Sequence, residues 1–320
     1  MEDIFIVTSS PHLRDNSSTR SIMLDVLIAL IPAVIAGVYF FGARTLWVIF
    51  ITVLSCVVCE YITRRILKRD NTIGDLSAVV TGVLLALNLP PSIPLWIAFV
   101  GGFIAIVVVK QLFGGIGQNF MNPALTARVM LMISWPGHMT RWSVPGQPDV
   151  VSSATPLALI KKGQEAVEGA LPGYLDMFFG NIAGCIGETS ALAILIGAAY
   201  LFYRKVISPE IPIAFIGTLA LFTWIFGGDS LFTGDFIYHV LAGGLLIGAF
   251  FMATDYATSP MTLKGRIIMG VGCGLLASII RLYTNYPEGV SFAILLMNIV
   301  VPLIDRFTIP KSFGGEKASA

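Results

Sequence analysis

Long apolar segments recur along the whole chain with few charges inside them, and they constrain its fold more than any other feature. Only 12% of the 320 residues are charged, whereas soluble domains carry about a quarter. About 20 apolar residues suffice for a helix to cross a bilayer. Ten apolar segments can be marked, at residues 22–41, 46–62, 73–89, 94–109, 121–135, 189–203, 211–226, 236–253, 266–283 and 290–304. The sequence therefore predicts an all-α integral membrane protein with about ten transmembrane helices.

The ten segments fall into two groups of five. We expect a first five-helix half at 1–135, a loop rich in turn-forming residues at 136–185, a second half at 186–310 and a polar, disordered tail at 311–320. Gly74-Asp75 opens one apolar segment and Gly234-Asp235 opens another, which indicates an internal repeat. Five spans is an odd number, so the second half should be inverted relative to the first. Inverted repeats are typical of transporters and channels.

Basic residues predict how the chain sits in the membrane, because cytoplasmic loops carry an excess of Lys and Arg. With ten spans and a cytoplasmic N-terminus, 14 of the 20 basic residues lie inside: Arg14, Arg20, Arg64, Arg65, Lys68, Arg69, Lys110, Arg204, Lys205, Lys264, Arg266, Arg306, Lys311 and Lys317. Five lie outside: Arg44, Arg141, Lys161, Lys162 and Arg281. We therefore expect both termini in the cytoplasm and the long loop outside it.

Several classes of function are not expected. The formal net charge of +1, without a basic stripe, gives no reason to expect nucleic-acid binding. The first residues have no apolar core of a signal peptide. Cys56 and Cys59 lie inside an apolar run with no second cysteine pair nearby in sequence, so they are interpreted as small packed residues and no metal site is expected.

One uncharged stretch of the long loop, 149–157, stands out for its small and hydroxyl-bearing side chains. Thr155 followed by Pro156 is a sound start for a short helix. Capping alone does not explain why Ser152, Ser153 and Ala154 precede it. These small residues would leave the Thr155 hydroxyl open to modification.

Four stretches of the chain contain recognisable motifs, among them 151–157 (VSSATPL) and 114–125 (GGIGQNFMNPAL). The first resembles the S-x-A-T-P-L flavin-attachment motif and the second the GG-x-G-x-N-x-x-NPA segment of the RnfD/NqrB family, whose members are membrane subunits of ion-translocating Rnf complexes and of sodium-pumping NADH:quinone reductases. Residues 187–192 (GETSAL) and the M-A-T-D…S-P pattern within 239–262 also match in order. The resemblance thus covers nearly the whole chain.

The resemblance implies that Thr155 carries FMN through a phosphoester, attached by a flavin transferase outside the cytoplasmic membrane. The orientation predicted from the Lys and Arg residues places this loop on the same side, outside the cytoplasm. It also implies an electron-carrying, multi-pass subunit of a prokaryotic cytoplasmic-membrane complex that links electron flow between ferredoxin and NAD⁺ to Na⁺ or H⁺ transport. The chain shows no nucleotide-binding fingerprint or cysteine cluster, so partner subunits should hold the NAD site, further flavin and the iron–sulfur centres.

Other residues are weaker candidates. Ser153, Ala154, Asn119 and Asn122 are candidates for flavin contact, and the glycine-rich turn before the asparagines could approach a second, non-covalent flavin. Close helix packing would use the same glycines. Glu188 and Asp255 are candidates for an ion path, because ionisable residues at membrane depth are costly and usually functional.

Two rival interpretations predict different behaviour. A small-solute channel of the urea or ammonium type would also suit inverted five-span repeats, and it predicts a colourless protein. A mere membrane anchor predicts that Thr155→Ala leaves electron transfer intact.

Overall fold

The computed structural model describes residues 18–143, 145, 155–161, 171–228, 230–284, 286 and 288–309, and every element in these ranges is a helix. The first half contains α1 (Thr19–Phe41), α2 (Arg44–Ile66), η1 (Ile73–Asp75), α3 (Ser77–Leu87), α4 (Leu95–Phe103), η2 (Ile104–Gln111) and α5 (Pro123–Ser134). The connecting region contains α6 (Pro136–Met139), α7 (Pro156–Lys161) and α8 (Tyr174–Phe179). The second half contains α9 (Ala191–Tyr203), α10 (Glu210–Phe226), α11 (Phe236–Leu241), α12 (Leu245–Ile247), η4 (Gly248–Met252), α13 (Leu263–Tyr283) and α14 (Val290–Thr308).

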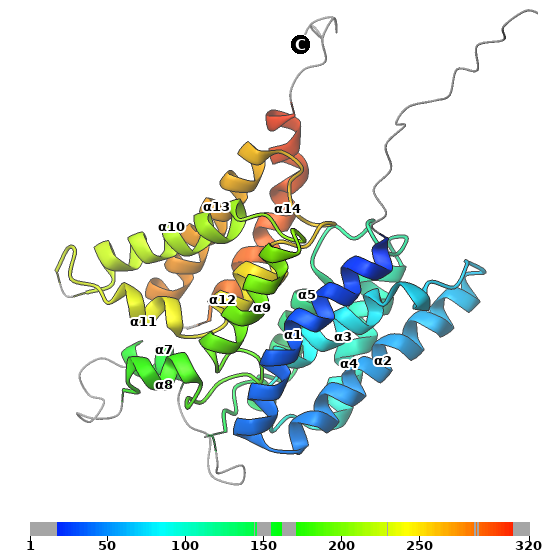
Figure 1. The fold of residues 1–320 in the computed structure, drawn as a ribbon, viewed down its shortest axis with the longest axis horizontal. Helices are drawn as coiled ribbons and strands as arrows, with labels where there is room; N and C mark the ends of the chain where they lie inside the picture. The colour runs from blue at the N-terminus through cyan, green and yellow to red at the C-terminus, as the bar shows by residue number, and fades with distance from the viewer. Residues whose placement is uncertain are drawn as a thin grey trace, which may run out of the picture.

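Helices α3, α12 and η4 are enclosed by other parts of the chain, whereas the short helices α7 and α8 lie at an edge of the bundle (Figure 1). Almost every residue of α3 is buried, as are all residues of α12 and η4. These helices are apolar on all sides because they have protein on all sides. The longer α1, α2, α13 and α14 bury at most half of their apolar stretches within the chain. Their remaining apolar surface faces outward, as expected of helices that contact lipid.

Small residues set the closest helix contacts. On α13, a Cβ added at Gly270 would lie 2.7 Å from Ala214 Cβ, and one added at Gly274 would lie 2.6 Å from Thr218 Cβ of α10. Glycines four residues apart let two membrane helices approach closely. This pair explains the extensive contact between α10 and α13.

The prediction of an all-helical protein is confirmed, but the ten-span count and the inverted repeat are not. Among the described residues, four helices are long and apolar enough to cross a membrane: α1, α2, α13 and α14. Helices α3, α5 and α9 have 11, 12 and 13 residues, short of the roughly 20 that a full span needs. These segments are nevertheless apolar, because residues packed inside a bundle are as apolar as residues that face lipid.

Two expected spans differ in detail from the observed helices. The segment 236–253 is broken after Leu241, so it forms α11, α12 and η4 instead of one helix. In the segment 73–89, Asp75 ends a short turn and its Oδ1 accepts a hydrogen bond from the Ser77 N–H at 2.8 Å, so α3 begins only there. The predicted tail 311–320 lies outside the described residues.

The start of α1 and the end of α14 lie at the same end of the bundle (Figure 1). Asp25, in the second turn of α1, pairs with Arg204 just after α9 at 3.2 Å. At the opposite end of α1, a Cβ added at Gly180, just after α8, would lie 2.8 Å from the Phe40 ring. The segment bearing Thr155 packs beside α8 and is therefore remote from the terminal ends of α1 and α14.

Candidate functional site

Thr155 directly precedes α7 and caps it. Its Oγ1 accepts a hydrogen bond from the Ala158 N–H at 3.3 Å, as expected for threonine before Pro156. The side chain is only 4% exposed, so the hydroxyl is less open than the small preceding residues indicated. The reason is that Leu157 belongs to a buried apolar cluster with Met177 and Tyr238, which draws α7 onto the bundle. Ser153 and Ala154 lie outside the described residues.

Helix α7 lies against the break between α11 and α12. Gly243, in this break, has φ +71°, a conformation that favours glycine. A Cβ added there would lie 2.8 Å from Leu157 Cδ1 and 3.3 Å from Arg281 Nη2. Arg281 donates hydrogen bonds to the carbonyl groups of His239 at 2.5 Å and Ala242 at 3.2 Å. The break therefore places a buried arginine directly beneath the α7 segment.

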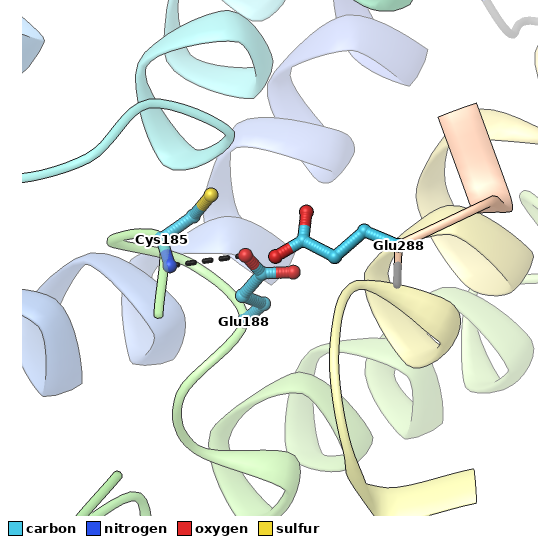
Figure 2. Close-up of side chains that lie close together, drawn as sticks. All are labelled: Cys185, Glu188 and Glu288. Atoms are coloured by element: carbon cyan, nitrogen blue, oxygen red, sulfur yellow. Dashed lines mark hydrogen bonds between the residues drawn. The ribbon is translucent and has the colours of Figure 1, made fainter. Parts of the chain in front are cut away.

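Beyond the break lies what we term the arginine–carboxylate cluster, made of Arg128, Cys185, Glu188 and Glu288. Figure 2 shows the two carboxyl groups turned toward each other beside Cys185, whose N–H donates to Glu188 Oε1 at 3.0 Å. Arg128 Nη2 hydrogen-bonds to Glu288, lies 3.5 Å from Cys185 Sγ and lies 3.9 Å from Glu188 Oε1. A Cβ added at Gly244 would lie 2.8 Å from Glu188 Oε2. The same helix break thus separates this cluster from the α7 segment.

Arg128 also connects the two halves of the chain. Its Nη1 donates to Asn88 Oδ1 at 2.8 Å, just after α3, and to Ser291 Oγ at 3.2 Å, in the first turn of α14. Gly187 and Ile186, next to Glu188 in sequence, donate backbone hydrogen bonds to residues 87 and 89 at the end of α3. The cluster therefore fixes the loop before α9 and the loop before α14 to the first half.

The electrostatics of the cluster are those of a buried ion-pair network. Burial and the neighbouring Glu188 carboxylate raise the pKa of Glu288, which lies in the loop between α13 and α14, to about 7. Ligand atoms of Cys185, Glu188 and Glu288 lie within 4.8 Å of one another, a spacing that could suit a cation. The Arg128 guanidinium, however, already contacts all three side chains. We therefore interpret Arg128, and not a metal ion, as the positive charge that balances the carboxylates of the cluster.

Buried polar atoms near the break have no hydrogen-bond partner among the described residues: the Tyr238 hydroxyl, His239 Nδ1 and Glu188 Oε2. Such atoms are rare unless something else satisfies them. The Tyr238 and His239 atoms, on α11 at the same side of the break as Leu157, suit a ligand with a hydrogen-bonding edge, as a flavin ring has. The Thr155 Oγ1 atom, at the start of a helix, fits a phosphate ester. The residues around Thr155 thus suit a phosphate-linked flavin chemically.

A second polar site, which we term the inner cavity, lies between the two halves, near the start of α3, the end of η2 and the loop after η4. A cavity of about 100 Å³ is lined by Ser77, Lys110, Asn119, Asn122 and Asp255, together with apolar side chains. Asn122 caps α5 through the Leu125 N–H and donates to the Met252 carbonyl at 3.3 Å. Burial raises the pKa of Asp255, in the loop after η4. This inner cavity contains three of the residues singled out in the sequence.

Lys110 is paired with a buried carboxylate beside the inner cavity. Its Nζ lies 2.8 Å from Glu60 Oε2 and 2.6 Å from Ser77 Oγ, while Thr72 donates to Glu60 Oε1 at 2.7 Å. Glu60 is fully buried. The pair is thus hydrogen-bonded on both sides, as a buried charge requires.

The structure therefore divides the predicted residues between two places. Asn119, Asn122 and Asp255 meet in the inner cavity, and Glu188 joins the arginine–carboxylate cluster near Thr155. Sequence reasoning missed the roles of Glu288 and Asn88. Arg128 lies within the apolar segment 121–135. A charged residue inside such a segment is usually functional, and this was the sequence signal for its central role.

The chain is similar to known proteins along nearly its whole length. The sequence profile of the NQR2, RnfD, RnfE family matches residues 6–314. The chain is 52% identical over 313 residues to the D subunit of the Na⁺-translocating ferredoxin:NAD⁺ oxidoreductase complex of Acetobacterium woodii, covering 97% of this chain and 96% of that one. It is 48% identical to the D subunit of the proton-translocating ferredoxin:NAD⁺ oxidoreductase complex of Clostridium ljungdahlii, covering 98% and 97%. It is 37% identical to the D subunit of the ion-translocating oxidoreductase complex of Halorhodospira halophila, covering 98% and 97%.

Proposed function

The chain belongs to the NQR2, RnfD, RnfE family, and on this premise we propose that it is the D-type membrane subunit of an ion-translocating ferredoxin:NAD⁺ oxidoreductase complex. The observation that carries the proposal is the end-to-end similarity to subunits of that name at 52% and 48% identity. Those two relatives are named for different ions, so the proposal covers transport of either Na⁺ or H⁺. The same similarity to subunits of oxidoreductase complexes speaks against the rival interpretation as a small-solute channel.

The finer proposal is that Thr155 carries FMN through a phosphoester on Oγ1. Its support is the position of Thr155 as a helix cap, next to a helix break lined by Arg281 and by buried, unpartnered polar atoms. A bound FMN supplies one-electron relay chemistry, which no side chain here provides. Pro156 and the apolar contact of Leu157 fix the direction in which the attachment atom points. Because Thr155 is buried, its modification requires that α7 separates from the bundle.

Buried charged residues support the proposed coupling to ion transport. Glu188 lies in the arginine–carboxylate cluster beyond the helix break, and Asp255 lies in the inner cavity. Both carboxylates lie beside short or broken helices, where freed backbone groups accompany ion sites in transporters. Asn119 and Asn122 stay candidates for contact with a second, non-covalent flavin, because both residues line the same cavity as Lys110.

The proposal places the protein in a prokaryotic cytoplasmic membrane, with the termini inside and Thr155 outside. The separation of Thr155 from the terminal ends of α1 and α14 (Figure 1) supports this orientation. The partners are a flavin transferase during maturation and further membrane and peripheral subunits that hold iron–sulfur centres, flavin and the NAD site. The four cysteines among the described residues are free and buried, and apart from Cys56 and Cys59 they lie on separate segments. The proposal therefore assigns the iron–sulfur centres to those partners.

In-gel flavin fluorescence tests the finer proposal. The subunit is produced with its flavin transferase, purified, denatured and run on a gel. We expect a fluorescent band from the wild type and from Thr140→Ala, an exposed threonine of the same loop whose Oγ1 bonds only its own helix. We expect none from Thr155→Ala. An equally fluorescent Thr155→Ala band would refute the attachment site and leave the family assignment intact.

A further inference from the structure

Two hollows adjoin where α9, α10 and α13 end or begin, at the same end of the bundle as Asp25 and Arg204. The first is a polar pocket of about 760 Å³, bounded by the turn 204–209 and the loop 254–261. The second is an apolar groove of about 440 Å³ between α9, α10 and η4. Phe202 and Pro209 line both hollows. The two hollows are therefore adjacent, one more polar and one apolar.

The polar pocket is cationic. Lys205 and Arg266 line it together with hydroxyl-bearing side chains, and no Asp or Glu is among its described lining residues. Arg266 is held in place, because it donates to Ser208 Oγ at 3.1 Å and lies 3.7 Å from Glu210. Lys205 is exposed and forms no ion pair with any described carboxylate. Its ammonium group is therefore the charge available to a ligand.

The apolar groove lies on the outward face of α10. Pro209, Pro212, Ile213, Ile216 and Gly217 line it, and positions three and four residues apart share one face of a helix. Ile213 is 68% exposed. A Cβ added at Gly217 would meet no described atom within 4 Å, so this glycine deepens the groove and serves no close helix contact. Such a groove suits a flexible hydrocarbon chain.

We propose that the two hollows form one binding site for an anionic phospholipid. The phosphate contacts Lys205 in the polar pocket, and one acyl chain lies in the groove along α10. Basic pockets between membrane helices suit anionic head groups, and the order of polar and apolar parts matches a lipid that enters from the membrane side. A free phosphate would leave the groove unexplained, whereas an anionic phospholipid accounts for both the cationic pocket and the apolar groove beside it.

Native mass spectrometry of the delipidated full chain in detergent tests the site. The probes are dioleoyl phosphatidylglycerol, dioleoyl phosphatidylcholine and inorganic phosphate. We expect the wild type to bind phosphatidylglycerol more tightly than phosphatidylcholine. Lys205→Gln should weaken phosphatidylglycerol binding about fivefold, because one interfacial cation is lost. Lys264→Gln, at an exposed lysine of the same end that does not line the pocket, should not change it.

Filling the groove tests the acyl-chain part. Gly217→Leu should weaken the binding of both lipids about tenfold, because several methylene groups are displaced. It should fold normally, because leucine forms helices better than glycine and the added atoms meet open space. Ala199→Leu, on the exposed face of α9 and outside both linings, is the matched control.

Three results would overturn the proposal. One is equal binding of both lipids by the wild type. Another is competition by inorganic phosphate together with an unaffected Gly217→Leu variant, which would indicate a site for a small anion. The third is loss of partner subunits from the Gly217→Leu complex without loss of phosphatidylglycerol, which would indicate a protein interface.

Discussion

Replacing Arg128 by leucine should strongly destabilise the protein, because this side chain supplies the positive charge of the buried arginine–carboxylate cluster. Its guanidinium lies 2.8 Å from Asn88 Oδ1, 3.2 Å from Ser291 Oγ and 3.5 Å from Cys185 Sγ. It also contacts the carboxylates of Glu188 and Glu288. Removing one partner of a buried ion pair typically costs about 3–5 kcal/mol. For a chain of this size each kcal/mol shifts the melting temperature by about 2–3 °C. We therefore expect a loss of about 6–15 °C at pH 8.

The pH dependence of this loss follows from Glu288. Burial and Glu188 raise its pKa to about 7 while Arg128 lowers it, so removing Arg128 raises the pKa of Glu288 further and lets the carboxyl group take up a proton, which removes the unpaired charge. The destabilisation should therefore be smaller at pH 6 than at pH 8. The double variant Arg128→Leu/Glu288→Gln should recover part of the loss at pH 8 for the same reason.

A thiol-reactive dye can report the unfolding, because all four cysteines are buried in the folded protein. The measurement is made in a Cys185→Ala background, since Cys185 contacts Arg128 and could react early. Arg65→Leu is the control, because Arg65 is exposed and bonds only the Tyr61 hydroxyl at 3.2 Å. A melting temperature of Arg128→Leu no lower than that of Arg65→Leu would refute the role assigned to the cluster.

The packing and the buried charges lead to three more predictions. Lys110→Met should lower the free energy of unfolding by about 3 kcal/mol or more, because it leaves Glu60 buried and unpaired. Adding Glu60→Gln to this variant should restore part of the lost stability in the same dye assay. Gly243→Val should destabilise by about 1–2 kcal/mol or more through its positive φ and the clash with Leu157, whereas Gly217→Val should not. Glu188→Gln should keep the in-gel flavin band but lower ion transport in proteoliposomes of the whole complex; unchanged transport would remove Glu188 from the ion path.

The sequence was sufficient to predict the helical class, because apolar segments with few charges have no other stable arrangement in lipid. It did not distinguish helices that face lipid from helices that are surrounded by protein. Helix α3 and the pair α12 and η4 are as hydrophobic as the outer helices, yet they are short and lie in the centre. The break at Gly243 likewise left no trace in hydropathy, because the residues on both sides of it are apolar.

The candidate site was predicted in part. Motif resemblance singled out Thr155, Glu188, Asn122 and Asp255, and the structure brings the last two together in one cavity. The pairing of Arg128 with Glu288 joins residues 160 positions apart. No local pattern encodes a contact of that separation, since it depends on how the two halves pack. The burial of Thr155 is also a tertiary effect, because the contacts of Leu157 draw the loop onto the bundle.

The most direct test of the central claim is the mass of the tryptic peptide 142–161 from protein produced with its flavin transferase. The proposed function predicts a peptide heavier by one FMN less one water, with fragmentation that locates the addition on Thr155. The same peptide from Thr155→Ala should have its unmodified mass. An unmodified wild-type peptide, or an addition on Ser152 or Ser153 instead, would contradict the assignment of Thr155 as the attachment residue.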